Sequence, residues 1–393
     1  MIWAPSQARA TLRRANNIVC RYLSNVAAMS IVVAGMSPVN AHHSSAPHFD
    51  RDTMIRLDGV VTEVRFVNPH AYVYFNVKGE GAEPVLWRCE LSAATTLQRR
   101  GWTAETPLHR GMQISINGSP ARREDNVCFL NSFSTPDGVT VNRNGNLLEL
   151  GLTGAPAFEV YADAAEGRPE YLDNGQPNLS GAWVRLRGMG AGGRDRQPAL
   201  LGNPAAANAD NLPTRPQNNA AGQAAADLWD YNFDNPALFC RNANIIHGWT
   251  HDSHVNEILQ EAETITFKYG YMDLVRTVHL NGSGHPNNIT MSTEGHSIGW
   301  WENDTLVVDT VGFSPNTMIP IREIMHSDQM HIVERYRYDR ESERLFRSYV
   351  VEDPKYFVTS YASEDMMGIS AKPWEPYDCV ELAGDNNRRA PDR

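Results

Sequence analysis

Short segments in which apolar and polar residues alternate recur along most of this chain, and they constrain its fold more than any other feature. Alternation with a period of two is typical of a β-strand with one buried face, because successive side chains point to opposite faces. Turn-forming residues separate the segments, and stretches with a helical period are few. The pattern predicts an all-β chain.

Five alternating segments and one helical stretch fall between residues 42 and 138. The predicted strands are 55–66, 71–77, 85–91, 112–117 and 126–133. The helix follows the third strand, from a cap at Ser92 to a stop at Gly101, and Gly59 is expected to form a bulge. Three strands, a helix and two strands is the order of an OB-type barrel, so we expect an OB-like β domain over residues 42–138.

A second series of short segments lies between residues 178 and 385. The predicted strands are 255–260, 264–269, 275–280, 297–301, 305–311, 331–338, 345–351 and 357–361. Such spacing is typical of an antiparallel barrel or sandwich. Gly181-Ala-Trp183 resembles the Gly-x-Trp that opens lipocalin-type barrels, which favours an antiparallel, lipocalin-like β-barrel.

Irregular and low-complexity sequence connects and interrupts these domains. Residues 139–177 carry no clear periodicity and are expected to form a linker. Residues 188–226, inside the second domain, consist largely of Ala, Asn and Gly. Such a segment buries too little apolar surface to offset its chain entropy, so we expect disorder or a loosely wrapped arm. Residues 386–393 form a polar tail.

The first 41 residues have the features of a signal peptide. A basic stretch ends at Arg21, an apolar run extends from Val26 to Met36, and Val39 and Ala41 occupy the positions that signal peptidase reads. The run is about 11 residues long, too short to span a bilayer, and no other segment approaches a membrane span. The sequence therefore predicts a periplasmic or secreted protein.

The charge of the chain excludes nucleic acid as a partner. The signal segment holds four arginines and no acidic residue, so its removal takes the net charge from −11 to −15. An acidic protein without a basic run is poorly suited to a phosphate backbone.

Removal of the signal segment leaves four cysteines, which suit an oxidising compartment. Four cysteines allow three connectivities, and one bridge within each domain is the simplest. The expected pairs are Cys89–Cys128 and Cys240–Cys379, with buried free thiols as the alternative.

Four motifs near the start of the first domain carry a resemblance to a known family: Ala41-His-His-Ser44, Phe49-Asp50, Leu57-x-Gly59-x-Val61 and Val67-Asn-Pro-His70. They resemble a family of small exported bacterial proteins catalogued as a domain of unknown function. The resemblance covers about 95 residues and implies export without implying an activity.

Motifs in the second domain carry another resemblance: Arg276-x-x-His279-Leu-Asn-Gly-x-x-His285-Pro286, the segment from His296 to Phe313, and His326-Ser-Asp-x-x-His331-x-x-Glu334-Arg335. They resemble an uncharacterised exported module common in soil bacteria. This resemblance covers about 150 residues and names no reaction.

Histidines at the predicted mature N-terminus raise the hypothesis of a metal site. Cleavage after Ala41 would leave His42 with a free amine beside its imidazole, followed by His43, with His70 near in sequence. Such nitrogen donors suit Cu(II). The alternative is that the terminus binds nothing and that His70 only supports a turn.

Asp309 is the first candidate for chemistry in the second domain, because it lies among valines, where a carboxylate requires a partner. Arg276, Arg335 and His296 are candidate partners. One interpretation is a structural ion pair. The other is an acid/base pair of His296 with Asp309 or Glu334, tuned by an apolar wall.

Two functions remain open. The first is an exported binding protein whose barrel holds an apolar small molecule, with the ligand-binding residues Arg276, Trp301, Arg335 and Tyr336. The second is a cofactor-independent lyase, hydratase or isomerase with the catalytic residues His296, Asp309 and Glu334 in the barrel lumen. Motifs for nucleotide cofactors, phosphate loops and zinc proteases are absent from the sequence. We therefore expect no cofactor, with copper at the mature N-terminus as the alternative.

Overall fold

The computed structural model describes residues 48–78, 81, 83–152, 168–185, 212–230, 234–251, 254–318 and 324–380. The predicted signal peptide, most of the low-complexity insertion and the tail lie outside the described residues. Within these ranges, no helix is long and apolar enough to cross a membrane.

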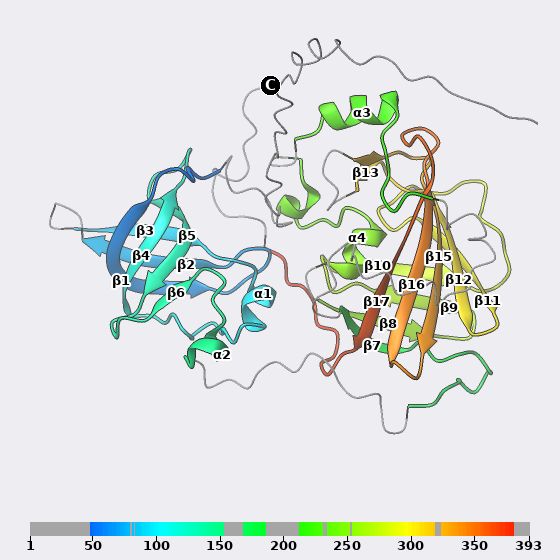
Figure 1. Ribbon diagram of the computed structural model, residues 1–393, viewed down its shortest axis with the longest axis horizontal. Coiled ribbons are helices and arrows are strands. Elements are labelled where there is room, and N and C mark those ends of the chain that lie inside the picture. The colour runs from blue at the N-terminus through cyan, green and yellow to red at the C-terminus, as the bar shows by residue number, and fades with distance from the viewer. Residues whose placement is uncertain are drawn as a thin grey trace, which may run out of the picture. The chain divides into compact units, whose positions relative to one another are not determined.

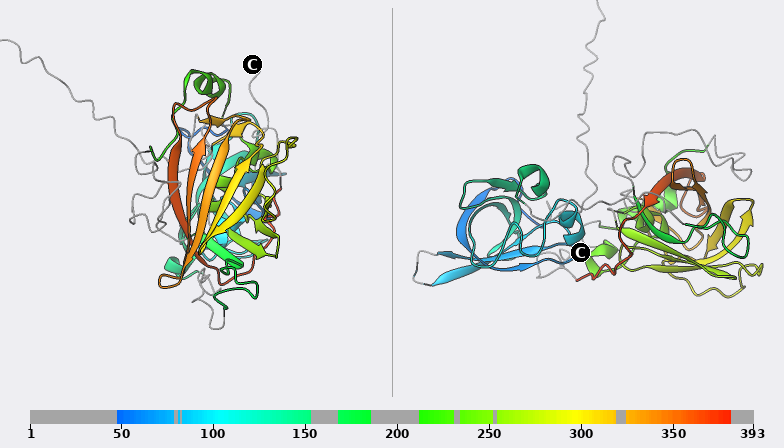
Figure 2. Two further views of the ribbon diagram at one scale, coloured as in Figure 1. Left: turned by 90° about the vertical axis from the view of Figure 1, so that its right-hand side faces the viewer. Right: turned by 90° about the horizontal axis from the view of Figure 1, so that it is seen from below.

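The first barrel is built from β1 (Ile55–Arg65), β2 (Tyr72–Lys78), β3 (Pro84–Glu90), β4 (Gln113–Pro120) and β5 (Val127–Ser134) (Figure 1). These strands hydrogen-bond in the order β3-β2-β1-β4-β5, and a parallel pairing of β3 with β5 closes the ring, which Figure 2 shows nearly end-on in its right-hand view. The helix α1 (Ala94–Gln98) lies between β3 and β4. The predicted OB-like barrel is confirmed.

Details of this barrel differ from the sequence predictions. The register of β1 against β2 shifts between Val61 and Glu63, so the bulge does not lie at Gly59. Gly59 instead packs closely against β2, where an added Cβ would lie 2.5 Å from the carbonyl oxygen of Asn76. The helix cap is Ala93, without a side-chain hydrogen bond, because Ser92 donates to Asn144.

The first barrel also extends into the range expected to be a linker. Strand β6 (Thr140–Asn142) pairs with β5, and the helix α2 (Leu147–Leu150) buries Leu147 completely. Asn146 caps α2 by accepting a hydrogen bond from the backbone N–H of Leu148. These elements are too short for their periodicity to be read from the sequence.

The disulfide Cys89–Cys128 joins the two strands that close the first barrel, since the two residues are register partners. It confirms the predicted pairing.

Replacing both Cys89 and Cys128 by alanine should destabilise the first barrel by about 4 kcal/mol, because the bridge closes a loop of 39 residues in the unfolded chain. Hydrogen exchange of peptides from β3 and β5 across a urea series measures this change. A Cys240→Ala, Cys379→Ala variant is the matched control, and equal effects of both variants on these peptides would contradict the assignment.

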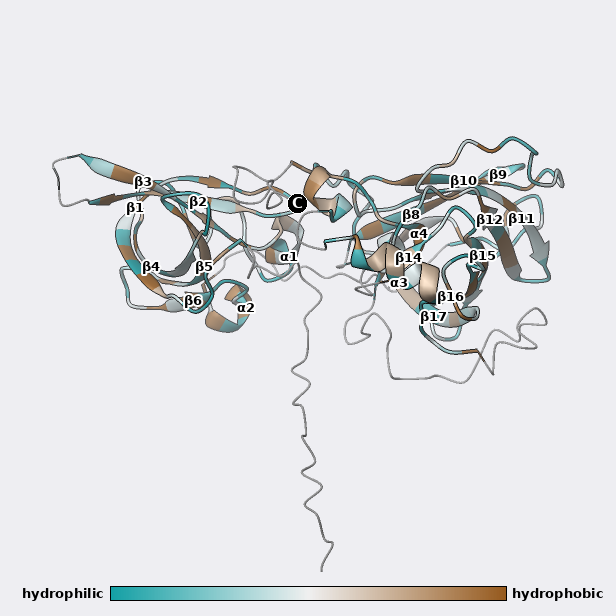
Figure 3. Ribbon diagram, turned by 90° about the horizontal axis from the view of Figure 1, so that it is seen from above, coloured by the Kyte–Doolittle hydropathy of each residue, from teal (hydrophilic) through white to brown (hydrophobic). Residues whose placement is uncertain are grey.

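The second barrel is closed and has nine strands: β7 (Gly181–Arg185), β8 (Val255–Gln260), β9 (Thr264–Lys268), β10 (Val275–His279), β11 (His296–Glu302), β12 (Thr305–Val311), β15 (His331–Asp339), β16 (Arg344–Glu352) and β17 (Tyr361–Ile369). Their order around the barrel is β10-β11-β12-β15-β16-β17-β7-β8-β9. All neighbours are antiparallel except β10 and β11, which run parallel. In Figure 3, hydrophobic and hydrophilic bands alternate along the strands, as the period of two predicts.

The last strand was predicted in the wrong place. The sequence indicated residues 357–361, whereas β17 begins at Tyr361 and continues to Ile369. The polar run from Ser363 to Asp365 concealed it. Asp365 faces the interior, where it is the register partner of Arg347 on β16.

Shorter elements accompany the second barrel in the described ranges. The strands β13 (Asn316–Thr317) and β14 (Met325–His326) form a separate pair, and η3 (Pro236–Phe239) is a 3₁₀ helix. The helix α3 (Ala220–Asp227) lies within the low-complexity range, where Asn219 caps a run of helix-favouring alanines.

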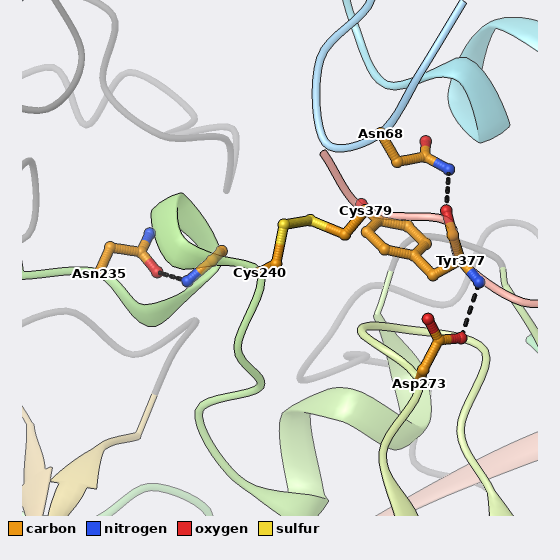
Figure 4. The surroundings of a disulfide bond; sticks show 7 residues. Asn68, Asn235, Cys240, Asp273, Tyr377 and Cys379 are labelled. Atoms are coloured by element: carbon orange, nitrogen blue, oxygen red, sulfur yellow. Dashed lines mark hydrogen bonds between the residues drawn. A yellow bond between two sulfur atoms is a disulfide. The ribbon is translucent and has the colours of Figure 1, made fainter. Parts of the chain in front are cut away.

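The disulfide Cys240–Cys379 confirms the second predicted pairing (Figure 4). Beside it, the backbone N–H of Tyr377 donates to Asp273 at 2.7 Å, and the side-chain amide of Asn68 donates to the carbonyl oxygen of Tyr377 at 2.8 Å. The two disulfides fit a location outside the cytoplasm.

Candidate functional site

The register between β12 and β15 divides the candidate residues between two faces of the barrel wall. Val308 is the partner of Glu334, and the neighbouring Asp309 is the partner of Val333. Because side chains alternate along a strand, Glu334 and Asp309 point to opposite faces. Glu334 is fully buried and faces the interior, whereas Asp309 is partly exposed on the outer face.

Charged residues form an inner ion network, which we define as Arg276, Glu334, Arg347 and Asp365. Arg276 Nη1 lies 2.6 Å from Glu334 Oε2, and Arg347 Nη1 lies 3.2 Å from Oε1. The hydroxyl of Tyr336 donates to Oε1 at 2.7 Å. Arg347 also donates through Nε to both oxygens of Asp365, at 3.1 Å each.

Burial raises the pKa values of Glu334 and Asp365, and the nearby arginines lower them. Burial alone raises the pKa of Glu334, but the nearby Arg276 and Arg347 outweigh it, so its pKa is lowered. Burial raises the pKa of Asp365, and Arg347 offsets this only in part. The arginines therefore stabilise the charge of Glu334 more than that of Asp365.

Glu334→Gln should destabilise the second barrel by about 3 kcal/mol or more at neutral pH, because it leaves buried guanidinium charge without its counterion. Since folding lowers the pKa of Glu334, this contribution is complete above its unfolded-state pKa and is lost as pH falls through the folded-state pKa. Urea unfolding of β15 and β16 peptides by hydrogen exchange, at pH 7 and in acid, measures it.

Asp328→Asn is the matched control, because Asp328 pairs with Lys355 at 2.8 Å and both side chains are at least 40% exposed. It should cost far less than Glu334→Gln, because water screens an exposed ion pair. An equal loss in both variants, or a Glu334→Gln effect that grows in acid, would contradict the role of Glu334.

Helix α4 (Ile245–Thr250) supplies a tryptophan to the barrel interior. The indole of Trp249 is almost fully buried, with ring centroids 5.5 Å from Phe267 and 5.9 Å from Tyr336. Arg347 Nη2 donates to the carbonyl oxygen of Ile246 at 3.2 Å and so connects α4 to the barrel wall.

Several buried N–H groups in this interior have no hydrogen-bond partner within the described ranges. Nε and Nη2 of Arg276, Nε1 of Trp249 and Nε1 of Trp301 have no hydrogen-bond partner among the residues that the structure describes. Both oxygens of Glu334 lie within ion-pair distance of an arginine, although Oε2 accepts no well-aligned hydrogen bond from a described residue. Buried donors without a partner indicate a missing water, ion or ligand.

Three of the four predicted ligand-binding residues face this interior. Arg276 and Tyr336 belong to the buried set around Glu334, and Trp301 packs against the interior core as the register partner of Leu306. Arg335 faces outward and donates to Glu302 at 2.7 Å.

An outer histidine cluster, which we define as His279, His285, His296, Asp309 and His331, lies on the opposite face. Asp309 Oδ1 lies 2.8 Å from His331 Nε2 and 3.2 Å from His285 Nε2. His285 Nδ1 lies 2.8 Å from His296 Nδ1, and the ring of His279 stacks beside His296 at 5.4 Å. Four neighbouring strands and the β10–β11 loop supply these residues.

Burial and neighbouring groups shift the pKa values of Asp309, His331 and His296 in different directions. Burial raises the pKa of Asp309, but its bonds to His331 and His285 outweigh this, so its pKa is lowered. The hydrogen bond to Asp309 raises the pKa of His331. Burial and the adjacent His285 and His279 lower the pKa of His296.

The three predicted catalytic residues do not form one site in the lumen. His296 and Asp309 are joined through His285 on the outer face, whereas Glu334 lies inside. The partners of Asp309 are His285 and His331, instead of Arg276, Arg335 or a direct bond to His296. His285 and His331 were therefore missed, although each lies in a motif that the sequence singled out.

Of the predicted copper ligands, His42 and His43 lie outside the described residues. His70 Nδ1 lies 2.8 Å from Glu90 Oε1, on the first barrel. In the described ranges, no group of three or more His, Cys, Asp or Glu side chains is arranged to hold a metal ion.

Asp309→Asn should lower the pKa of His331, because it removes the negative charge that favours the imidazolium. Titration of the imidazole signals by NMR, with a chelator present, measures the shift. Glu352→Gln is the control, since Glu352 lies farther away, at 3.7 Å from His331 Nδ1, and should cause a smaller change. An unchanged His331 titration in Asp309→Asn would refute the assignment.

Comparison with known proteins gives one family match. Residues 29–128 match the model of a family of unknown function, DUF6152, which covers about a quarter of the chain. Neither the curated proteins nor the solved structures gave a match. The family match supports an uncharacterised family for the first domain and leaves the function of the second barrel to its geometry.

Proposed function

We propose that this chain is an exported protein whose second barrel binds a small molecule carrying hydrogen-bond acceptor oxygens. The signal-like segment 1–41 and the two disulfides support export. The observation that carries the binding function is the set of buried N–H groups on Arg276, Trp249 and Trp301 without a partner among the described residues.

The charge of the interior favours an anionic or strongly polar acceptor. Each buried N–H without a partner costs roughly 1–3 kcal/mol of desolvation, which a ligand oxygen would recover. A carboxylate accepts several hydrogen bonds and suits a guanidinium with free N–H groups. The surrounding Phe267, Tyr269 and Trp249 rings suit an apolar or aromatic body. The ligand predicted from sequence as apolar is thus refined to an amphipathic one.

The enzyme alternative receives less support. It requires His296, Asp309 and Glu334 to act on one substrate, but the barrel wall separates Glu334 from the other two. Acid/base catalysis requires groups within hydrogen-bond reach of the same reacting atoms. Binding requires only the donors that already face the interior.

Trp249→Phe tests the binding function, because it removes one N–H and preserves an aromatic ring. Benzoate is the probe, with benzyl alcohol as its neutral counterpart, and calorimetry of the full chain measures affinity. We expect benzoate to bind more tightly than benzyl alcohol, and Trp249→Phe to weaken benzoate binding about tenfold, the value of one charge-assisted hydrogen bond.

Trp300→Phe is the matched control, because Trp300 is 42% exposed and its N–H donates to Glu302 at 3.0 Å. It should leave affinity unchanged. Absence of benzoate binding, or equal weakening by both substitutions, would contradict binding through the interior donors.

A further inference from the structure

Two imidazole nitrogens of the outer histidine cluster face each other at close range. His285 Nδ1 and His296 Nδ1 are 2.8 Å apart, and their rings are inclined at 70°. Two arrangements fit this distance. Either one nitrogen carries a proton and donates to the other, or both present lone pairs to a shared cation.

Asp309 determines which nitrogen of His285 is available. Its carboxylate lies 3.2 Å from Nε2 of His285, so a neutral His285 carries its proton on Nε2 and presents a lone pair at Nδ1. Nε2 of His331 lies 2.8 Å from the same oxygen, Asp309 Oδ1. A carboxylate that orients a histidine through its second nitrogen is the usual support of a metal-binding imidazole.

The separation of the two nitrogens discriminates between metal geometries. With metal–nitrogen bonds of about 2.0 Å, two adjacent ligands of a square arrangement lie about 2.8 Å apart, whereas tetrahedral ligands lie about 3.3 Å apart. The observed 2.8 Å matches the square arrangement. Imidazole ligands in a square arrangement suit Cu(II) and Ni(II), and copper binds more tightly of the two.

We propose that His285 and His296 bind Cu(II) through their Nδ1 atoms on the outer face of the second barrel, with Asp309 as the positioning residue of His285. These two imidazoles are the protein ligands that we assign, and the described part of the chain places no group of three ligands for a metal. The side chains of His285 and Asp309 are 20% and 24% exposed, so the ion can enter from solvent. The site differs in its residues from the N-terminal hypothesis at His42 and His43.

Titration of the full chain with Cu(II) tests this proposal, in a background carrying His42→Ala and His43→Ala to remove the competing terminal histidines. Calorimetry measures the affinity, and electron paramagnetic resonance reports the number of bound nitrogens. We expect one bound copper ion whose spectrum shows two nitrogen ligands in a square arrangement. His285→Ala and His296→Ala should each weaken binding at least tenfold.

Two further variants separate a metal site from a structural contact. Asp309→Asn keeps both ligands and should weaken copper binding about tenfold, as loss of a supporting carboxylate does. His109→Ala, at an exposed histidine of the first barrel, should change nothing. Circular dichroism confirms that each variant folds.

Three results would overturn the proposal. The first is no copper binding in the His42→Ala, His43→Ala background. The second is copper binding that survives both His285→Ala and His296→Ala. The third is a spectrum of the bound copper without coupling to two imidazole nitrogens, because the close contact would then be an ordinary N–H···N hydrogen bond.

Discussion

The buried carboxylate of Glu334, held between two guanidinium groups, is the interaction on which the second barrel depends. Arg276 on β10 and Arg347 on β16 reach it from different parts of the barrel wall, and Arg347 continues to Asp365 on β17 and to the backbone of α4. Buried charges of this kind add little net stability over apolar packing, but each charge requires all of its partners. The network therefore fixes the strands and α4 in one arrangement.

The same network leaves Arg276 with more donors than its partners can use. Glu334 occupies Nη1, and no described residue accepts from Nε or Nη2. Trp249 adds another buried N–H close to the same aromatic residues. A purely structural interior is expected to match its donors with acceptors, and these N–H groups have no acceptor among the described residues. This links the packing of the barrel to its proposed function.

Alternation along the strands gives the two faces of the barrel wall different chemistry. The inner face of β15 carries Glu334 and Tyr336, while the outer face carries His331 beside Asp309 of β12. The outer cluster is partly exposed and rich in imidazoles, so it suits exchange with solvent ions. The inner network is buried and charged, so it suits a ligand that lies in the interior away from water.

Much of the fold could be predicted from the sequence. The alternation of apolar and polar residues is a local pattern that reveals most strands, and the presence of two cysteines in each domain indicated the two disulfides. Strand β17 could not be predicted, since Asp365 breaks the apolar alternation to meet Arg347. The sequence also predicted Asp309 and Glu334 in one site, whereas they lie on opposite faces of the barrel wall. Their strands are neighbours, but the register offsets them by one residue, and one residue reverses the face. His285 reaches Asp309 from a loop, which no strand pattern predicts.

Native mass spectrometry of the full chain, purified from its host without denaturation, shows whether the second barrel carries a ligand. We expect a bound organic molecule with acceptor oxygens. We also expect Arg276→Lys, which keeps the charge beside Glu334 but lacks the additional guanidinium donors, to lose this molecule. A bare protein mass for the wild-type chain, or the same bound molecule in Arg276→Lys, would refute ligand binding through Arg276.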